Sequence, residues 1–180
     1  MQTRPSPSHG GRPILALAAF LILCFAVAAV GAASAAHSIP TWYAGLVKPQ
    51  FNPPNWIFAP VWTILYTVMA IAAWLVWRTP RRAGRRGSLQ SIEDTQGSAR
   101  LDALVVFGIQ LFFNFLWTPI FFHYHRLLVA VVVILALWIA IVATMVLFWR
   151  VRPLAGALML PYLGWVSFAI ALNLALLRRN

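Results

Sequence analysis

The segment Trp42-Tyr43-Ala44-Gly45-Leu46-Val47-Lys48-Pro49-Gln50-Phe51-Asn52-Pro53-Pro54-Asn55-Trp56 separates two long apolar runs of the chain. Its three prolines remove backbone donors and fix φ, so this stretch is predicted not to form a helix. Aromatic side chains in a turn between two apolar spans favour an ordered cap. Such a cap can close over something held between helices.

Composition indicates a membrane protein. Of the 180 residues, 62% are hydrophobic and only 9% are charged, whereas a soluble domain usually carries about a quarter charged residues. The charges are grouped, and each charge-free stretch can hold the ~20 apolar residues of one spanning helix. We therefore predict an all-α membrane protein, a five-transmembrane-helix bundle with spans at residues 13–35, 57–77, 101–122, 127–149 and 154–177.

The basic residues are distributed unevenly between the two ends of this bundle. The net charge is +11, but anionic lipid headgroups suffice as partners, so no nucleic acid is predicted. One end holds ten basic residues: Arg4, Arg12, Arg78, Arg81, Arg82, Arg85, Arg86, Arg100, Arg150 and Arg152. The other end holds Lys48, Arg126, Arg178 and Arg179. The positive-inside rule then predicts a cytoplasmic N-terminus in a bacterial cell membrane.

The first apolar run has a second interpretation. Arg12, the following Ala/Leu-rich run and Ala33-Ser34-Ala35 are similar to a cleavable signal sequence, whose removal would leave four spans. The run is long for a signal peptide, so a retained first helix is favoured. Cys24 is the chain's one cysteine and cannot form an intrachain disulfide.

The remaining segments are predicted to be irregular. Residues 1–13 form a polar tail that we expect to be disordered, followed by one transmembrane domain at residues 14–178. Residues 79–98 are rich in Arg, Gly and Ser, which predicts a flexible loop. The connections near residues 125–126 and 150–152 are short, which makes the helices they join antiparallel neighbours.

Polar and aromatic residues form stripes at helical spacing on three of the spans. They are Gln110, Asn114 and Trp117 in the third span; Tyr162, Trp165, Ala169 and Asn173 in the fifth; Trp62, Tyr66, Ala73 and Trp77 in the second. One interpretation is a cavity for a large, flat, apolar ligand. The other is that the amides join helices by interhelical hydrogen bonds. Spacing alone leaves both open.

Conventional catalytic and metal sites are not predicted. His123 and His125 have no nearby carboxylate or cysteine, so we expect an interfacial loop rather than a metal site. The predicted spans contain no Asp or Glu beyond Asp102 at the start of the third, which argues against a carboxylate-based proton pump. No conventional acid, base or nucleophile stands out either, so a binding protein is favoured over an enzyme.

Several of these motifs, in this order, resemble the signature of the TspO/MBR family, the tryptophan-rich sensory and translocator proteins. The first group is Trp42-Tyr43, Lys48-Pro49, Pro53-Pro54, Trp56 and Pro60-Val61-Trp62-Thr63. The others are Gln110-Leu111, Asn114 and Trp117 in the third span, and Pro161-Tyr162, Trp165, Ala169 and Asn173 in the fifth. The resemblance extends from about Ile39 to Leu177.

The resemblance implies a five-helix bundle, usually a homodimer, that binds porphyrin, haem and related tetrapyrroles and needs no other cofactor. By motif, the ligand-binding residues would be Trp42, Tyr43, Pro53, Trp62, Gln110, Asn114, Trp117, Trp165, Ala169 and Asn173. It also implies two alternatives: light-dependent porphyrin breakdown, with Trp62 and Trp165 as catalytic residues, and transport of tetrapyrroles or sterols. The pattern proposed for sterol contact needs a tyrosine before Arg178 and Arg179, and residues 172–177 lack one.

Overall fold

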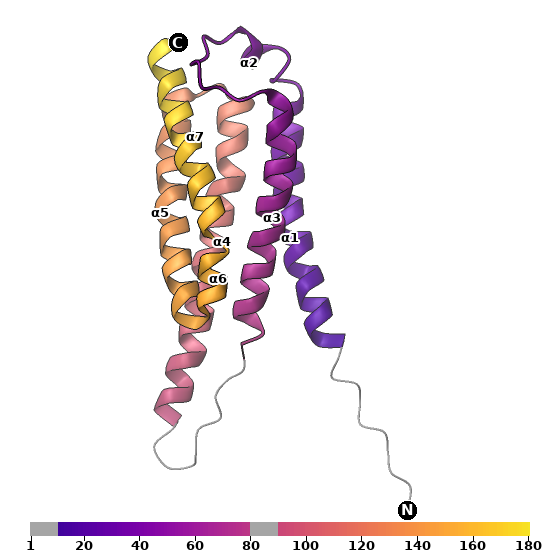
Figure 1. Cartoon of the computed structure of the whole chain (residues 1–180), viewed down its shortest axis with the longest axis vertical. Coiled ribbons are helices and arrows are strands. Elements are labelled where there is room, and N and C mark those ends of the chain that lie inside the picture. The colour runs from indigo at the N-terminus through magenta and orange to yellow at the C-terminus, as the bar shows by residue number, and fades with distance from the viewer. Residues whose placement is uncertain (1–10, 80–89) are drawn as a thin grey trace, which may run out of the picture.

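The computed structural model describes residues 11–79 and 90–180, and every regular element in them is helical. Five long apolar segments of this part of the chain can cross a membrane, which confirms the predicted bundle. They are α1 (Gly11–Ala36), α3 (Phe58–Trp77), α4 (Gln90–Phe122), α5 (Leu127–Val151), and α6 (Pro153–Ala157) together with α7 (Leu160–Arg179). The membrane-spanning parts of these helices begin and end within three residues of the predicted spans, although α4 itself begins earlier, at Gln90 (Figure 1).

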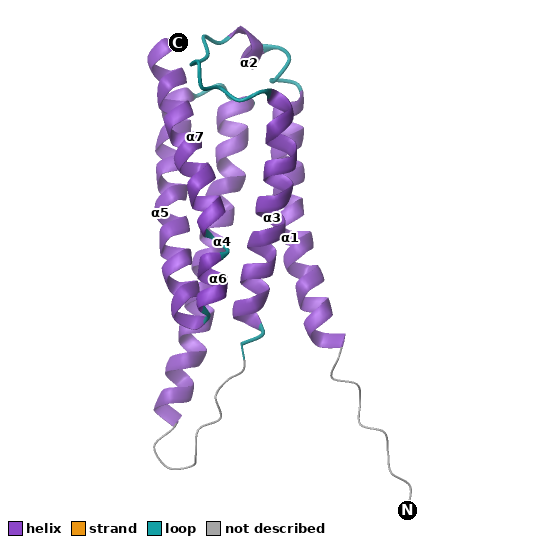
Figure 2. Ribbon diagram, in the orientation of Figure 1, coloured by secondary structure: helices purple, strands orange, loops and turns teal. Residues whose placement is uncertain are grey.

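The helices run side by side, and the first loop lies across one end of the bundle. α1 packs against α3 and α4, α4 packs against α5, and α5 packs against α6 and α7. The loop carries α2 (Trp42–Gly45) and the 3₁₀ turn η1 (Asn55–Ile57). The prediction that the Trp42–Trp56 segment forms no helix is therefore wrong at its two ends and holds for residues 46–54, which contain the three prolines. It lies at the same end as the C-terminus, opposite the start of α1 (Figure 2).

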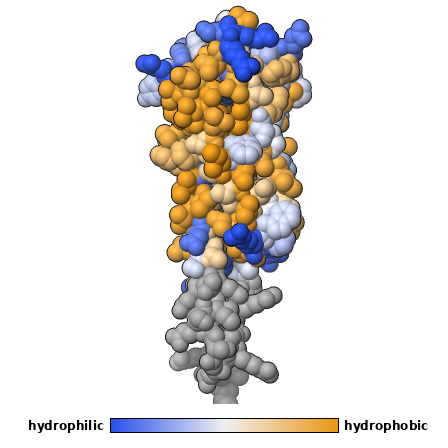
Figure 3. Space-filling model, turned by 90° about the vertical axis from the view of Figure 1, so that its left-hand side faces the viewer, coloured by the Kyte–Doolittle hydropathy of each residue, from blue (hydrophilic) through white to orange (hydrophobic). Residues whose placement is uncertain are grey.

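The outer surface of the bundle is an apolar belt. On the face shown in Figure 3, hydrophobic residues cover the middle and hydrophilic residues gather toward the ends. Along α5, large apolar side chains are exposed about once per turn, among them Leu128, Val132, Leu135 and Ile139. A surface of this kind is stable only in contact with lipid.

The fifth span is interrupted between α6 and α7. Pro161 lies in the first turn of α7 and has no N–H to continue a preceding helix. The chain turns at Leu158 and Met159, where the Met159 N–H donates to the Gly156 carbonyl oxygen at 3.0 Å. A Cβ on Gly156 would lie 2.8 Å from the Cα of Trp149. The close approach of α6 to α5 therefore requires glycine at this position.

The predicted tail and flexible loop fall largely on residues 1–10 and 80–89, which lie outside the described residues. Where they overlap the described part, the structure differs: α1 begins at Gly11 and α4 begins at Gln90. Residues 11–13 and 90–98, predicted to be irregular, are thus helical.

A chain of hydrogen bonds joins three helices in the middle of the bundle. The Asn114 amide of α4 donates to the Tyr162 hydroxyl of α7 at 2.6 Å. The Tyr66 hydroxyl of α3 donates to Asn114 Oδ1 at 2.5 Å. All three side chains are buried. The interhelical bonding considered for the stripes is therefore present at Asn114.

The other two stripe amides do not join helices in this way. Gln110, one turn from Asn114, has its Nε2 3.9 Å from Met69 Sδ, and its Oε1 has no partner in the described part of the chain. Asn173 donates to the carbonyl oxygen of Ala169 in its own helix at 3.0 Å.

Replacing these two neighbouring amides is expected to have unequal effects on stability. Asn114→Leu breaks two hydrogen bonds and leaves two buried phenols unpaired, a loss of about 1–3 kcal/mol. Gln110→Leu, the matched control, removes only a weak contact to sulfur and is expected to change the unfolding temperature little. Thermal unfolding in one detergent, followed by circular dichroism, measures both. Equal losses for the two variants would contradict the assigned role of Asn114.

Candidate functional site: a cavity beneath the first loop

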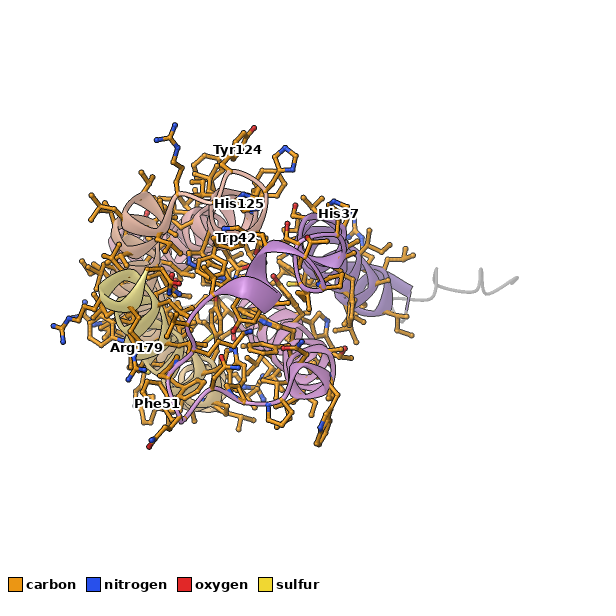
Figure 4. All side chains as sticks on the ribbon, turned by 90° about the horizontal axis from the view of Figure 1, so that it is seen from above. His37, Trp42, Phe51, Tyr124, His125 and Arg179 are labelled. Atoms are coloured by element: carbon orange, nitrogen blue, oxygen red, sulfur yellow. The ribbon has the colours of Figure 1, made fainter. Side chains whose placement is uncertain are left out.

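A cavity of about 510 Å³ lies between α1, α3, α4 and α7 at the end covered by the first loop. None of its lining residues is charged. Figure 4 views this end from above, with the loop crossing the bundle. An uncharged cavity of this kind is suited to an apolar body rather than to an ion.

The wall formed by α1 is made of small residues apart from Phe25. Ala28, Gly31, Ala32 and Ala35 are among those that line it. Their short side chains leave open the space between α1 and the helices opposite. Above Phe25, α1 therefore adds little side-chain volume to the cavity.

The wall formed by α3 consists of aromatic rings held by the central hydrogen bonds. The Trp62 ring centroid lies 5.4 Å from that of Tyr66 and 6.3 Å from that of Tyr162. Trp62 and Tyr66 line the cavity, whereas Asn114 is not among its lining residues. Asn114 therefore fixes the two phenol rings against which Trp62 packs.

The wall formed by α7 is also aromatic. Trp165 packs edge to face with Phe58 at a centroid distance of 5.9 Å and lies 5.6 Å from Phe168. Ala169 and Asn173 follow along α7, and all five residues line the cavity. The wall presents rings at mid-depth and a small and a polar side chain nearer the loop.

Tyr43 closes the cavity from the loop side. Its hydroxyl donates to Asn52 Oδ1 at 2.7 Å, and its ring lies 5.8 Å from that of Phe122. Burial raises the pKa of Tyr43, and the hydrogen bond to Asn52 opposes that rise in part. The phenol therefore stays neutral at physiological pH and remains a hydrogen-bond donor that ties the loop to itself.

Further contacts attach the loop to the bundle. Trp42 stacks on His125 of the α4–α5 connection, with ring centroids 4.1 Å apart and planes at 18° (Figure 4). The Val47 N–H donates to Asn180 Oδ1 at 3.0 Å beyond the end of α7. Phe51 packs edge to face against Phe168 at 6.2 Å. These contacts hold the loop over the cavity as a lid.

The ten residues predicted to bind ligand occupy three kinds of position. Those that line the cavity are Tyr43, Trp62, Trp117, Trp165, Ala169 and Asn173. Gln110 and Asn114 are buried in the helix packing and do not line it. Trp42 and Pro53 belong to the lid without lining the cavity. Periodicity shows which residues share a face of a helix. It does not show whether side chains of a neighbouring helix lie between that face and the cavity.

The sequence stripes did not include the α1 wall, nor Phe121 and Phe168, which also line the cavity. The first span contains no polar or aromatic stripe to mark one face. The available signal was weaker: Ala28, Ala32 and Ala35 recur at spacings of four and three, which places small residues on one face. Among the described residues, no group of His, Cys, Asp and Glu is arranged to hold a metal ion.

Comparison with known proteins places the chain in a family. The TspO/MBR family model matches residues 20–179. The chain is 38% identical to the tryptophan-rich protein TspO of Archaeoglobus fulgidus, over 93% of this chain and 98% of that protein. It is 37% identical to protein CrtK of Rhodobacter capsulatus, over 92% and 95%, and 37% identical to the human translocator protein, over 77% and 75%. With a match over nearly its whole length, the chain belongs to the TspO/MBR family and is an integral, multi-pass membrane protein.

Proposed function

We propose that the protein binds porphyrin- or haem-type tetrapyrroles in the cavity beneath the first loop, in a sensory or tetrapyrrole-handling role. The observation that carries this proposal is an uncharged cavity of about 510 Å³ walled by the indole rings of Trp62, Trp117 and Trp165. Its volume is within the range of ligand pockets, roughly 300–1,000 Å³. The tetrapyrrole is the ligand, and no further cofactor is needed.

The shape of the walls supports a flat ligand in particular. Aromatic rings on α3, α4 and α7 provide faces and edges for stacked and edge-to-face contacts with a planar π system. The small residues of α1 leave room for the opposite face of such a plate. In this assignment the six lining residues contact the ligand, Asn114 positions the α3 wall, and Trp42 holds the lid.

Shortening Trp62 is expected to weaken porphyrin binding. Trp62→Ala removes a ring from the cavity wall and is expected to raise the Kd for protoporphyrin IX about tenfold. The measurement is a titration followed by the porphyrin's own absorption band, which avoids the change in tryptophan fluorescence. Trp56→Ala is the matched control, because Trp56 is 72% exposed and does not line the cavity. Equal affinities for wild type, Trp62→Ala and Trp56→Ala would reject this site.

Light-dependent breakdown of porphyrin is the second candidate, and one arrangement favours it. Trp62 of α3 and Trp165 of α7 line the same cavity. A porphyrin there would contact both indoles, and an electron-rich indole can donate an electron to a photoexcited porphyrin.

This alternative predicts a spectral change of bound porphyrin under illumination. The change should be lost in Trp62→Phe and Trp165→Phe, which keep a ring in the wall but are poorer electron donors. Trp117→Phe, a substitution in the same cavity, serves as the control. If wild type binds porphyrin but shows no spectral change under illumination, light-dependent breakdown is rejected and binding remains the proposed function.

We infer from the charges that the N-terminus faces the cytoplasm of a bacterial cell. Arg78, Arg150 and Arg152 lie at the end where α1 begins, and the lid end carries fewer basic residues. Positive residues are retained on the cytoplasmic side. Alkaline phosphatase fused after Asn180 should then be active, and green fluorescent protein at the same place should be dark. The reverse pattern would invert the topology.

A further inference from the structure

We propose that the ligand carries a carboxylate that lies at the lid end of the cavity and is recognised by Lys48. This inference rests on the proposed tetrapyrrole binding and specifies how the ligand is oriented.

The lid end carries positive side chains and no acidic ones. Lys48, Arg126, Arg178 and Arg179 lie there, in the first loop, before α5 and at the end of α7. The three acidic residues of the chain all fall in α4, toward its start at the opposite end (Figure 1). No Asp or Glu side chain is therefore available to neutralise the cations around the lid.

Lys48 does not itself line the cavity, but it contacts a residue of the cavity wall. Its ammonium lies 4.9 Å from the centroid of the Tyr43 ring, and Tyr43 lines the cavity. The ammonium donates one hydrogen bond, to the carbonyl oxygen of Ala44 at 3.1 Å. A lysine ammonium has three N–H groups, so two remain for a ligand.

The surroundings of Lys48 favour an anion over a neutral group. The side chain is half-buried and lies over the ring of Tyr43, which belongs to a cavity lining without charge. Opposite charges attract more strongly near such a low-dielectric region than in water. A tetrapyrrole would therefore lie with its carboxylate edge toward Lys48 and its apolar edge toward Trp62 and Tyr66, deeper between the helices.

The test compares two ligands that differ in charge and share one macrocycle: protoporphyrin IX and its dimethyl ester, titrated in an uncharged detergent. Wild type is expected to bind the acid more tightly, by roughly fivefold, and added salt should narrow the difference. Lys48→Gln should abolish this difference in affinity, because it weakens binding of protoporphyrin IX and leaves binding of the dimethyl ester unchanged. Lys48→Arg should keep it, and so should Arg150→Gln, which removes a cation from the opposite end.

Each other outcome has a separate meaning. If neither ligand binds wild type, the proposed function fails. If wild type binds acid and ester equally, or if Lys48→Gln weakens both alike, the carboxylate assignment is overturned while the cavity assignment stands. The titration is repeated in nanodiscs with neutral or anionic phospholipid. If protoporphyrin IX binds more tightly than its ester in neutral nanodiscs but not in anionic ones, Lys48 binds a lipid headgroup instead. That result also overturns the proposal.

Discussion

The hydrogen bonds of Asn114 to Tyr66 and Tyr162 are the interaction on which the cavity depends. Hydrocarbon offers no partner to a polar side chain, so an unpaired amide or phenol there is costly. One residue of α4 pairs with a phenol from α3 and a phenol from α7, which sets the spacing of three helices at once. Trp62 packs against both phenol rings. The ring most suited to contact a ligand thus takes its position from a polar residue that does not line the cavity.

The lid is held by contacts of a different kind. Trp42 on His125 and Phe51 on Phe168 are ring contacts near the bundle surface, and such pairs contribute about 0.5–1.5 kcal/mol each beyond the area they bury. The pairing of Val47 with Asn180 adds exposed hydrogen bonds. Each contact is weak enough to break by itself, whereas the buried pairs of Asn114 are not.

The spans could be predicted from sequence because a helix enters the membrane according to its own composition, which the charge-free stretches reveal. The helical start of α4 at Gln90 was missed, since its residues are polar and apolar content was the criterion. Asn114 could be placed on an inward face, but spacing left ligand contact and helix pairing equally possible. The contribution of α1 could not be predicted, because Ala28 and Gly31 contribute through their small side-chain volume. Small residues give no distinctive pattern in an apolar run.

Packing elsewhere in the bundle holds the walls of the cavity apart. The α3 wall is fixed from behind by the bonds of Asn114, and the α1 side chains at Ala28 and Ala32 are too short to reach across. Lower in the bundle, Phe20, Leu21 and buried Cys24 pack α1 into the core, which holds it at this distance. Atoms lining an empty space forgo dispersion contacts that a close-fitting body restores. A flat ligand thus gains contacts with walls that are already in place, and little of its binding energy is spent on rearranging the helices.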